Sequence, residues 1–102
     1  MKINNTKLDR VLEIELDPYK DFRGYYLETY NKELYNSNNI DIKFIQDDIS
    51  VSKKNVLRGI HGDDETWKLI SCFYGKFYLI VVNNDPSSNQ YKKWTSFILS
   101  ED

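Results

Sequence analysis

The alternation of apolar and polar residues is the dominant pattern along this chain. Leucine and isoleucine alternate with glutamate over residues 12–16, the period-two signature of a half-buried strand, and Asp17-Pro18 ends the run because proline cannot continue a β ladder. Comparable runs predict further strands at residues 24–30, 43–52, 56–61, 68–73, 77–82 and 91–99. Short strands with turn signals roughly every eight to twelve residues are typical of a β-sandwich or a β-barrel.

The connecting segments carry turn chemistry and a single short helix. Residues 32–35 predict one helical turn, and the run Asn36-Ser37-Asn38-Asn39 predicts a loop. Tyr74-Gly75-Lys76 predicts a tight hairpin between two strands, and residues 83–88 predict a longer turn. No repeat, low-complexity tract or internal linker interrupts the chain, so a single domain is expected.

Composition limits the classes of function. At 102 residues, with 40% hydrophobic and 15% aromatic residues, the chain is expected to pack a core. The net charge is −2 and the cations are scattered among acids, which argues against a nucleic-acid partner. The N-terminus leads straight into charged residues, and no run approaches the roughly eighteen apolar residues of a membrane span. A cytoplasmic protein without membrane contact is therefore expected.

The strongest chemical signal is the run Leu57-Arg58-Gly59-Ile60-His61-Gly62, which holds the only histidine of the chain. Arg58 lies three residues before His61, and Lys68 lies seven residues after it. Imidazole is the one side chain whose ordinary pKa lies near neutrality, so His61 is a candidate proton acceptor. A structural histidine satisfied by a backbone carbonyl is the alternative. One histidine and no Cys-x-x-Cys pair leave no histidine-rich metal site, so metal-free acid–base chemistry is expected.

Several sequence blocks occur in an ordered series. Residues 21–28 read DFRGYYLE, residues 44–52 read FIQDDISVS, and residues 56–61 read VLRGIH, followed by Lys68-Leu69. In this order the blocks resemble the dTDP-4-dehydrorhamnose 3,5-epimerase family, whose members are cupin-type jelly rolls acting on nucleotide-linked 4-keto-6-deoxy sugars. The resemblance covers nearly the whole chain and implies an all-β cupin or jelly-roll sandwich. The phrase IHGDDETWKL is most similar to a branch acting on GDP-linked 4-keto heptoses.

The resemblance implies an isomerase that inverts C3, or C3 and C5, of a nucleotide-diphospho-4-keto-6-deoxy sugar in surface-polysaccharide biosynthesis. Removing a proton beside a ketone leaves an enolate, so His61 is expected to be the base and Lys68 to stabilise the charge on the C4 oxygen. Arg58 has the planar fork that suits a phosphate or the substrate's oxygens. The alternative for Lys68 is a surface lysine, and the alternative for Arg58 is a structural ion pair. No cofactor is implied, and the family's exchange of N-terminal strands between subunits implies a homodimer.

Five further residues are expected to bind the substrate. By resemblance Arg23 and Glu28 serve the nucleotide and Tyr26 stacks on its base, although a core aromatic is the alternative for Tyr26. Gln46 and Asp48 share one face of a predicted strand and by resemblance line the nucleotide or sugar pocket. Asp48 stands where the family has asparagine, which adds a charge there.

The last predicted strand runs into Ser100-Glu101-Asp102, which has turn chemistry. The jelly roll is therefore expected to be incomplete at its C-terminus, with residues 1–102 forming the N-terminal part of one epimerase domain. In the family a tyrosine acts as the acid and an aspartate orients the histidine; both are expected beyond residue 102, so the chain alone is expected to show little or no turnover. The alternative is a non-catalytic nucleotide-sugar-binding module or an inactive fragment. A sugar 3,4-ketoisomerase on the same fold is less favoured by the D-x-R-G and R-G-x-H blocks.

Overall fold

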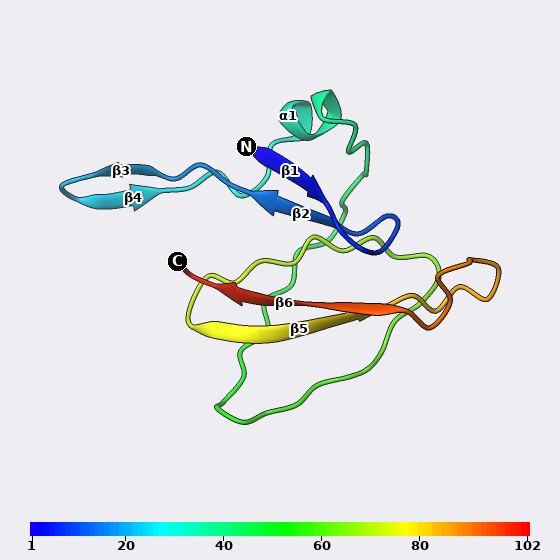
Figure 1. Cartoon of the computed structure of the whole chain (residues 1–102). Helices are drawn as coiled ribbons and strands as arrows, with labels where there is room; N and C mark the ends of the chain where they lie inside the picture. Colours follow the sequence, from blue (N-terminus) through cyan, green and yellow to red (C-terminus); the bar gives the residue numbers. More distant parts are fainter.

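Three antiparallel hairpins and one short helix make up the molecule (Figure 1), in a computed structural model that describes residues 1–102. In chain order the elements are β1 (Lys2–Asn5), β2 (Leu12–Glu15), β3 (Tyr19–Asp21), β4 (Gly24–Tyr26), α1 (Lys32–Ser37), β5 (Lys76–Val82) and β6 (Trp94–Ser100). This sheet-dominated architecture confirms the expected all-β class. No helix is long and apolar enough to span a membrane.

The first hairpin, β1–β2, contains one strand that the sequence pattern did not predict. β2 lies within the predicted run, whereas β1 has Ile3 as its one apolar side chain. Ile3 lies opposite Ile14, and this cross-strand pair fixes the register. The connection is closed by Thr6, whose hydroxyl accepts from the Leu8 N–H at 3.2 Å and donates to the Val11 carbonyl at 2.7 Å. Leu8 is 4% exposed.

The second hairpin, β3–β4, extends away from the rest of the molecule (Figure 1). Asp21 pairs with Gly24, which leaves a two-residue connection between the strands. The Asp21 carboxylate closes this turn by accepting the Arg23 N–H at 2.8 Å. Gly24 has a φ of +130°, a region that residues with a side chain rarely adopt. The predicted strand over 24–30 is shorter than expected, because pairing ends at Tyr26.

Helix α1 confirms the predicted helical turn and continues it to Ser37. Asn31 caps its N-terminus by accepting a backbone N–H of the first turn at 3.0 Å. Tyr35 holds the helix to the chain before it: it is 2% exposed, and its hydroxyl donates to the Thr29 carbonyl at 3.0 Å. The Tyr35 and Tyr30 rings meet edge to face with centroids 4.9 Å apart.

The third hairpin, β5–β6, is the longest and carries apolar side chains on both faces. Its strands lie close to the predicted 77–82 and 91–99, although β6 begins three residues later than expected. The register places on one face Phe77, Leu79, Val81, Thr95, Phe97 and Leu99. The opposite face includes Tyr78, Ile80, Trp94 and Ile98, all of them exposed.

The strands predicted at 43–52, 56–61 and 68–73 are wrong, because residues 40–75 contain no strand. A strand needs a backbone ladder, and within residues 41–74 one backbone–backbone hydrogen bond forms, from the Val56 N–H to the Lys53 carbonyl at 3.4 Å. The hairpin predicted at Tyr74-Gly75-Lys76 is wrong for the same reason, since β5 pairs with β6 instead of with the segment before it. Gly75 is at a bend, with a φ of +77°.

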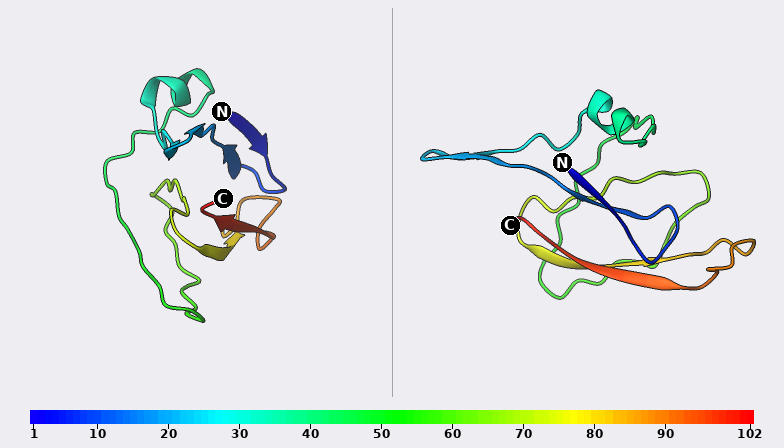
Figure 2. Two further views of the ribbon diagram at one scale, coloured as in Figure 1. Left: turned by 90° about the vertical axis from the view of Figure 1, so that its left-hand side faces the viewer. Right: turned by 45° about the horizontal axis from the view of Figure 1, so that its top comes forward.

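Hairpins β1–β2 and β5–β6 lie one above the other (Figures 1 and 2), and their connecting loops are bridged by side chains. Gln90 donates through Nε2 to the Lys7 carbonyl at 3.0 Å and accepts the Asp9 N–H through Oε1 at 2.8 Å. Arg10 and Asp85 add an exposed ion pair at 3.7 Å. We call this set of contacts the Gln90 bridge.

The packed core expected from composition is wrong. Leu8 and Tyr35 are the only buried residues, and large apolar side chains are exposed along the whole chain. The physical reason is that strands of different hairpins do not approach one another closely, so apolar faces are left without a covering layer.

Candidate functional site

His61 lies in an exposed segment whose shape depends on Gly59. Gly59 has a φ of +105°, which favours glycine, and a Cβ added to it would lie 3.5 Å from both the backbone nitrogen and Nδ1 of His61. The imidazole thus folds back toward Gly59. No hydrogen bond involves the ring, so no backbone carbonyl satisfies it as the structural alternative would require.

Arg58 is anchored to the preceding sequence block. Its Nε donates to the Ser52 hydroxyl at 2.8 Å, and its Nη2 donates to the Val51 carbonyl at 3.3 Å. These contacts join residues 44–52 to residues 56–61, two blocks that the sequence analysis singled out. No carboxylate pairs with the guanidinium, so its charge is not neutralised within the chain.

Lys68 follows a turn that is organised by Asp63. The Asp63 carboxylate accepts the Glu65 N–H at 2.9 Å, the Thr66 N–H at 2.7 Å and the Thr66 hydroxyl at 2.9 Å. These bonds, those of Thr66 first, hold the pKa of Asp63 below its ordinary value, and the charge of Lys68 acts in the same direction. The two side chains do not form an ion pair within 4.0 Å. Sequence reasoning missed Asp63, although aspartate is a common turn residue because its side chain accepts backbone N–H groups shortly after it.

Gln46 and Asp48 point to the same side of the chain, as the predicted strand alternation required. The Gln46 amide donates to both carboxylate oxygens of Asp48, at 3.0 and 3.3 Å. The two residues are exposed. An asparagine at position 48 would accept from Gln46 through one oxygen only, so the acid allows a contact that the family's usual residue does not.

The β3–β4 hairpin carries Arg23 and Tyr26. Arg23 donates from Nε to both oxygens of Asp21, at 3.1 and 3.3 Å, and from Nη2 to one of them. The side-chain bond and then the backbone bond from Arg23 lower the pKa of Asp21. Tyr26 is 73% exposed at the end of β4, so it is not a core aromatic in this chain.

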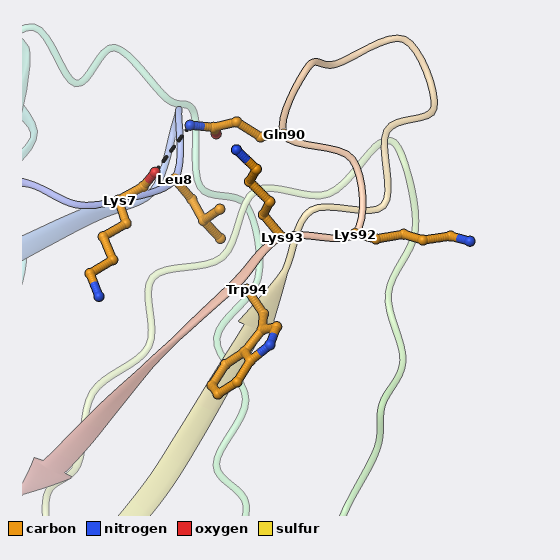
Figure 3. A pocket seen from close by; sticks show the side chains of 6 residues that line it. All are labelled: Lys7, Leu8, Gln90, Lys92, Lys93 and Trp94. Carbon is orange, nitrogen blue, oxygen red and sulfur yellow. Dashed lines mark hydrogen bonds between the residues drawn. The ribbon is translucent and has the colours of Figure 1, made fainter.

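Two cavities lie away from these side chains. The larger, about 520 Å³, is next to the Gln90 bridge (Figure 3) and is lined by Lys7, Leu8, Gln90, Lys92, Lys93 and Trp94. In Figure 3, Lys92 points away from Lys7 and Lys93, and its Nζ lies 5.4 Å from the centre of the Tyr91 ring. The smaller, about 100 Å³, is lined by Met1, Leu16, Asp17, Glu28, Asn31, Leu34 and Tyr35. Of the predicted site residues, Glu28 alone lines either cavity.

The predicted site residues therefore form three separate groups. One is on the β3–β4 hairpin (Arg23, Tyr26), one beside α1 (Glu28), and one along residues 46–68 (Gln46, Asp48, Arg58, His61, Lys68). No three or more histidine, cysteine, aspartate or glutamate side chains gather in a way that could hold a metal ion. The third group has the composition needed to remove a proton and to stabilise the negative charge that is left: an unbonded imidazole, an ammonium and an anchored guanidinium.

Comparisons with known proteins agree over the length of the chain. A family model described as dTDP-4-dehydrorhamnose 3,5-epimerase matches residues 5–102. A dTDP-4-dehydrorhamnose 3,5-epimerase of Methanothermobacter thermautotrophicus is 35% identical over 99 residues, covering 95% of this chain and 54% of the relative. The enzyme of the same name from Escherichia coli is 33% identical, covering 100% and 57%. The chain thus spans a little over half the length of these relatives.

Two solved structures have the same fold. The crystal structure of dTDP-4-dehydrorhamnose 3,5-epimerase from Bacillus anthracis, with TDP and PPi bound, superposes with a TM-score of 0.90 at 28% identity and covers 99% of this chain and 60% of that one. The enzyme from Elizabethkingia anophelis gives a TM-score of 0.78 at 30% identity, covering 99% and 57%. This agreement confirms the cupin-type fold. The superposition with the Bacillus anthracis structure covers 99% of this chain, although residues 40–75 of this chain form no strand.

Proposed function

The chain belongs to the dTDP-4-dehydrorhamnose 3,5-epimerase family, and we propose that it forms the N-terminal part of a nucleotide-sugar epimerase domain. The observation that carries this proposal is the coincidence, in one connected segment, of His61, Lys68 and Arg58 with the family's sequence blocks. The proposed reaction inverts C3, or C3 and C5, of a nucleotide-diphospho-4-keto-6-deoxy sugar. Surface-polysaccharide biosynthesis is the proposed context.

The proposed chemistry is proton removal next to the C4 ketone. An unbonded imidazole nitrogen of His61 accepts the proton from the carbon, and the bond's electron pair moves into an enolate whose negative oxygen faces the Lys68 ammonium. Return of a proton to the opposite face of the same carbon completes the inversion, so no oxidant or reductant is needed. The residue that returns the proton is not assigned among residues 1–102.

The proposed binding residues all precede His61 in the sequence. Arg58 is already oriented by Ser52 and Val51, so it would lose little side-chain freedom on meeting an oxygen-rich substrate. Gln46 and Asp48 would contact the sugar or nucleotide, and Arg23, Glu28 and Tyr26 the nucleotide. Since these last three lie apart from residues 46–68, we propose a homodimer in which they serve the site together.

The nucleotide of the substrate is proposed first as a class and then as one particular nucleotide. A nucleoside diphosphate is supported by the relative from Bacillus anthracis, whose structure holds TDP and PPi. The segment from Gly62 to Lys68 favours a GDP-linked heptose over a dTDP-linked hexose. Calorimetric titration with GDP and with dTDP separates the two, because tighter binding of GDP is expected and equal or reversed affinities would leave only the broader assignment.

A non-catalytic nucleotide-sugar-binding module is the second candidate. It is favoured by the exposure of His61 and Lys68, which line neither described cavity. A base normally acts in a site that excludes water, so this exposure fits binding without turnover.

Deuterium exchange decides between the two candidates. The complete domain that contains residues 1–102 is incubated in D₂O with a dTDP-linked and, separately, a GDP-linked 4-keto-6-deoxy sugar, and isotope content and stereochemistry are measured at C3 and C5. An epimerase incorporates deuterium, and His61→Asn lowers that rate by about 10²–10⁴-fold while nucleotide affinity stays within a few-fold. Nucleotide binding without any exchange would support the binding module, and exchange at an unchanged rate in His61→Asn would remove His61 from the mechanism.

A further inference from the structure

The connection between His61 and Lys68 has a constraint that the sequence blocks do not explain. A base at the α-carbon and a cation at the neighbouring carbonyl oxygen act on atoms of one sugar, so both must reach the same few ångströms. Seven extended residues span about 23 Å. The chain between His61 and Lys68 therefore has to turn back for both to act on one substrate.

A local turn between the two residues is closed by one carboxylate. Asp63 accepts three hydrogen bonds from Glu65 and Thr66, at 2.7 to 2.9 Å. The neighbouring acids Asp64 and Glu65 make no hydrogen bond through their carboxylates, although all three residues are exposed. Asp63 alone of this acidic run is engaged with the backbone, which separates its role from that of a solvated charge.

The same carboxylate leaves the lysine available. Asp63 and Lys68 are near enough for their charges to interact. They nevertheless form no ion pair within 4.0 Å, so the ammonium is not consumed by a partner in the turn. An acid that both shapes the turn and leaves the ammonium unpaired suits a residue that presents the lysine to a substrate.

We propose that Asp63 is a positioning residue, which sets the place of Lys68 relative to His61 by closing the turn over residues 63–66. It touches no reacting atom itself. This inference rests on the proposed function, because it assigns Asp63 to the work of His61 and Lys68. It concerns the hydrogen bonds of the turn and not a binding site for a cation.

The geometry of the turn is tested without turnover. Trp67 lies between Thr66 and Lys68, so in a Trp94→Phe background it is the single tryptophan and reports on the turn. Asp63→Ala removes the acceptor and is expected to lower the fluorescence anisotropy of Trp67 and to speed amide exchange at Glu65 and Thr66 by about tenfold. Asp63→Asn keeps an acceptor oxygen and is expected to retain most of both signals. Asp64→Ala is the matched control and should change neither.

The consequence for the reaction is tested by deuterium exchange with the same four sequences carried in the complete domain. Asp63→Ala is expected to lower kcat by about tenfold or more with KM within about threefold, because misplacement of a transition-state group by an ångström is costly. Asp63→Asn should recover most of the loss. Unchanged anisotropy and kcat in Asp63→Ala would overturn the proposal, and so would equal losses in the alanine and asparagine variants, since charge rather than the turn would then matter. An absence of exchange in the wild type would instead overturn the proposed function, while the anisotropy still decides whether Asp63 closes the turn.

Discussion

At the scale of single residues, Arg58 and Lys68 show two ways of presenting a cation. Arg58 uses Nε and Nη2 on Ser52 and Val51, which leaves Nη1 free and its direction fixed. Lys68 makes no ion pair within the chain, and its flexible stem is constrained only through the turn before it. A fixed fork suits a group that is present throughout binding, whereas a free ammonium suits charge that develops during the reaction.

Lys68→Met follows from this difference. Methionine keeps the stem's volume and removes the charge, so the rate of deuterium exchange is expected to fall by about 10²–10³-fold while KM changes within a few-fold. Steady-state kinetics over a range of substrate concentrations measures both constants. Lys54→Met, at an exposed lysine that makes no ion pair within 4.0 Å, is the control. A loss confined to KM would reassign Lys68 to ground-state binding.

The candidate residues could be predicted from sequence where the chemistry depends on residue type. His61, Lys68 and Arg58 were proposed from their side-chain chemistry and their order along the chain. Asp63 was missed because its proposed role comes from backbone N–H groups, which every residue has. The pairing of Gln46 with Asp48 agreed with strand alternation even though no strand forms there, because extended backbone alternates its side chains with or without a partner.

At the scale of elements, predictions were correct where the hydrogen-bonding partner lies within the same helix or in the adjacent strand of a hairpin. β5 and β6 complete a ladder with each other, and α1 satisfies its hydrogen bonds internally with Asn31 as cap. Residues 43–73 have strand-like composition but no ladder, and composition does not indicate whether a partner exists. β1 and β3 were missed for the opposite reason, since pairing with β2 and β4 creates strands from runs such as Lys2–Asn5 with little apolar signal.

The β3–β4 hairpin gives a prediction about pH. Arg23 lowers the pKa of Asp21 from the ordinary value of 3.8. The ion pair between the two is therefore fully present at pH values above the ordinary carboxyl pKa, and it is lost as the pH falls through the lowered pKa. A ¹³C NMR titration of the Asp21 carboxyl is expected to give a midpoint below 3.8. Arg23→Gln should move that midpoint up toward the ordinary value. Lys20→Gln, a charge removed from the same hairpin, should leave it in place; an equal shift in both variants would mean that net charge and not the contact sets it.

At the scale of the whole molecule, two layers, hairpin β1–β2 and hairpin β5–β6, are connected by few contacts. Strands of different hairpins do not approach one another closely, and Leu8 and Tyr35 are the only buried side chains. Large exposed apolar surfaces mark places where other protein surface binds. The two apolar faces of β5–β6 make that hairpin the main candidate for such contact, in keeping with the proposed homodimer.

The Gln90 bridge gives a stability prediction. Gln90→Ala removes two hydrogen bonds between the layers and is expected to lower the free energy of unfolding by about 1–2 kcal/mol. Gln90→Glu keeps the acceptor for Asp9 and loses the donor to Lys7, so an intermediate loss is expected. Urea denaturation measures all three proteins. The exposed neighbour Asn89→Ala should stay within about 0.5 kcal/mol of the wild type; a similar loss there would show that the loop as a whole, not the bridge, matters.

The same bridge has a kinetic consequence. Each of its two hydrogen bonds joins residues that lie far apart in the sequence, 81 positions in one case and 83 in the other, whereas the β3–β4 connection spans two residues. Because the entropy of closing a loop grows with the logarithm of its length, closing the long loop costs about 3 kcal/mol more than closing a hairpin. The hairpins are therefore expected to form first, within about microseconds, and β1–β2 and β5–β6 to join afterwards. Since the bridge is expected to form late, weakening it should speed unfolding far more than it slows folding, so a glutamine side chain in a surface loop contributes to the lifetime of the assembled molecule.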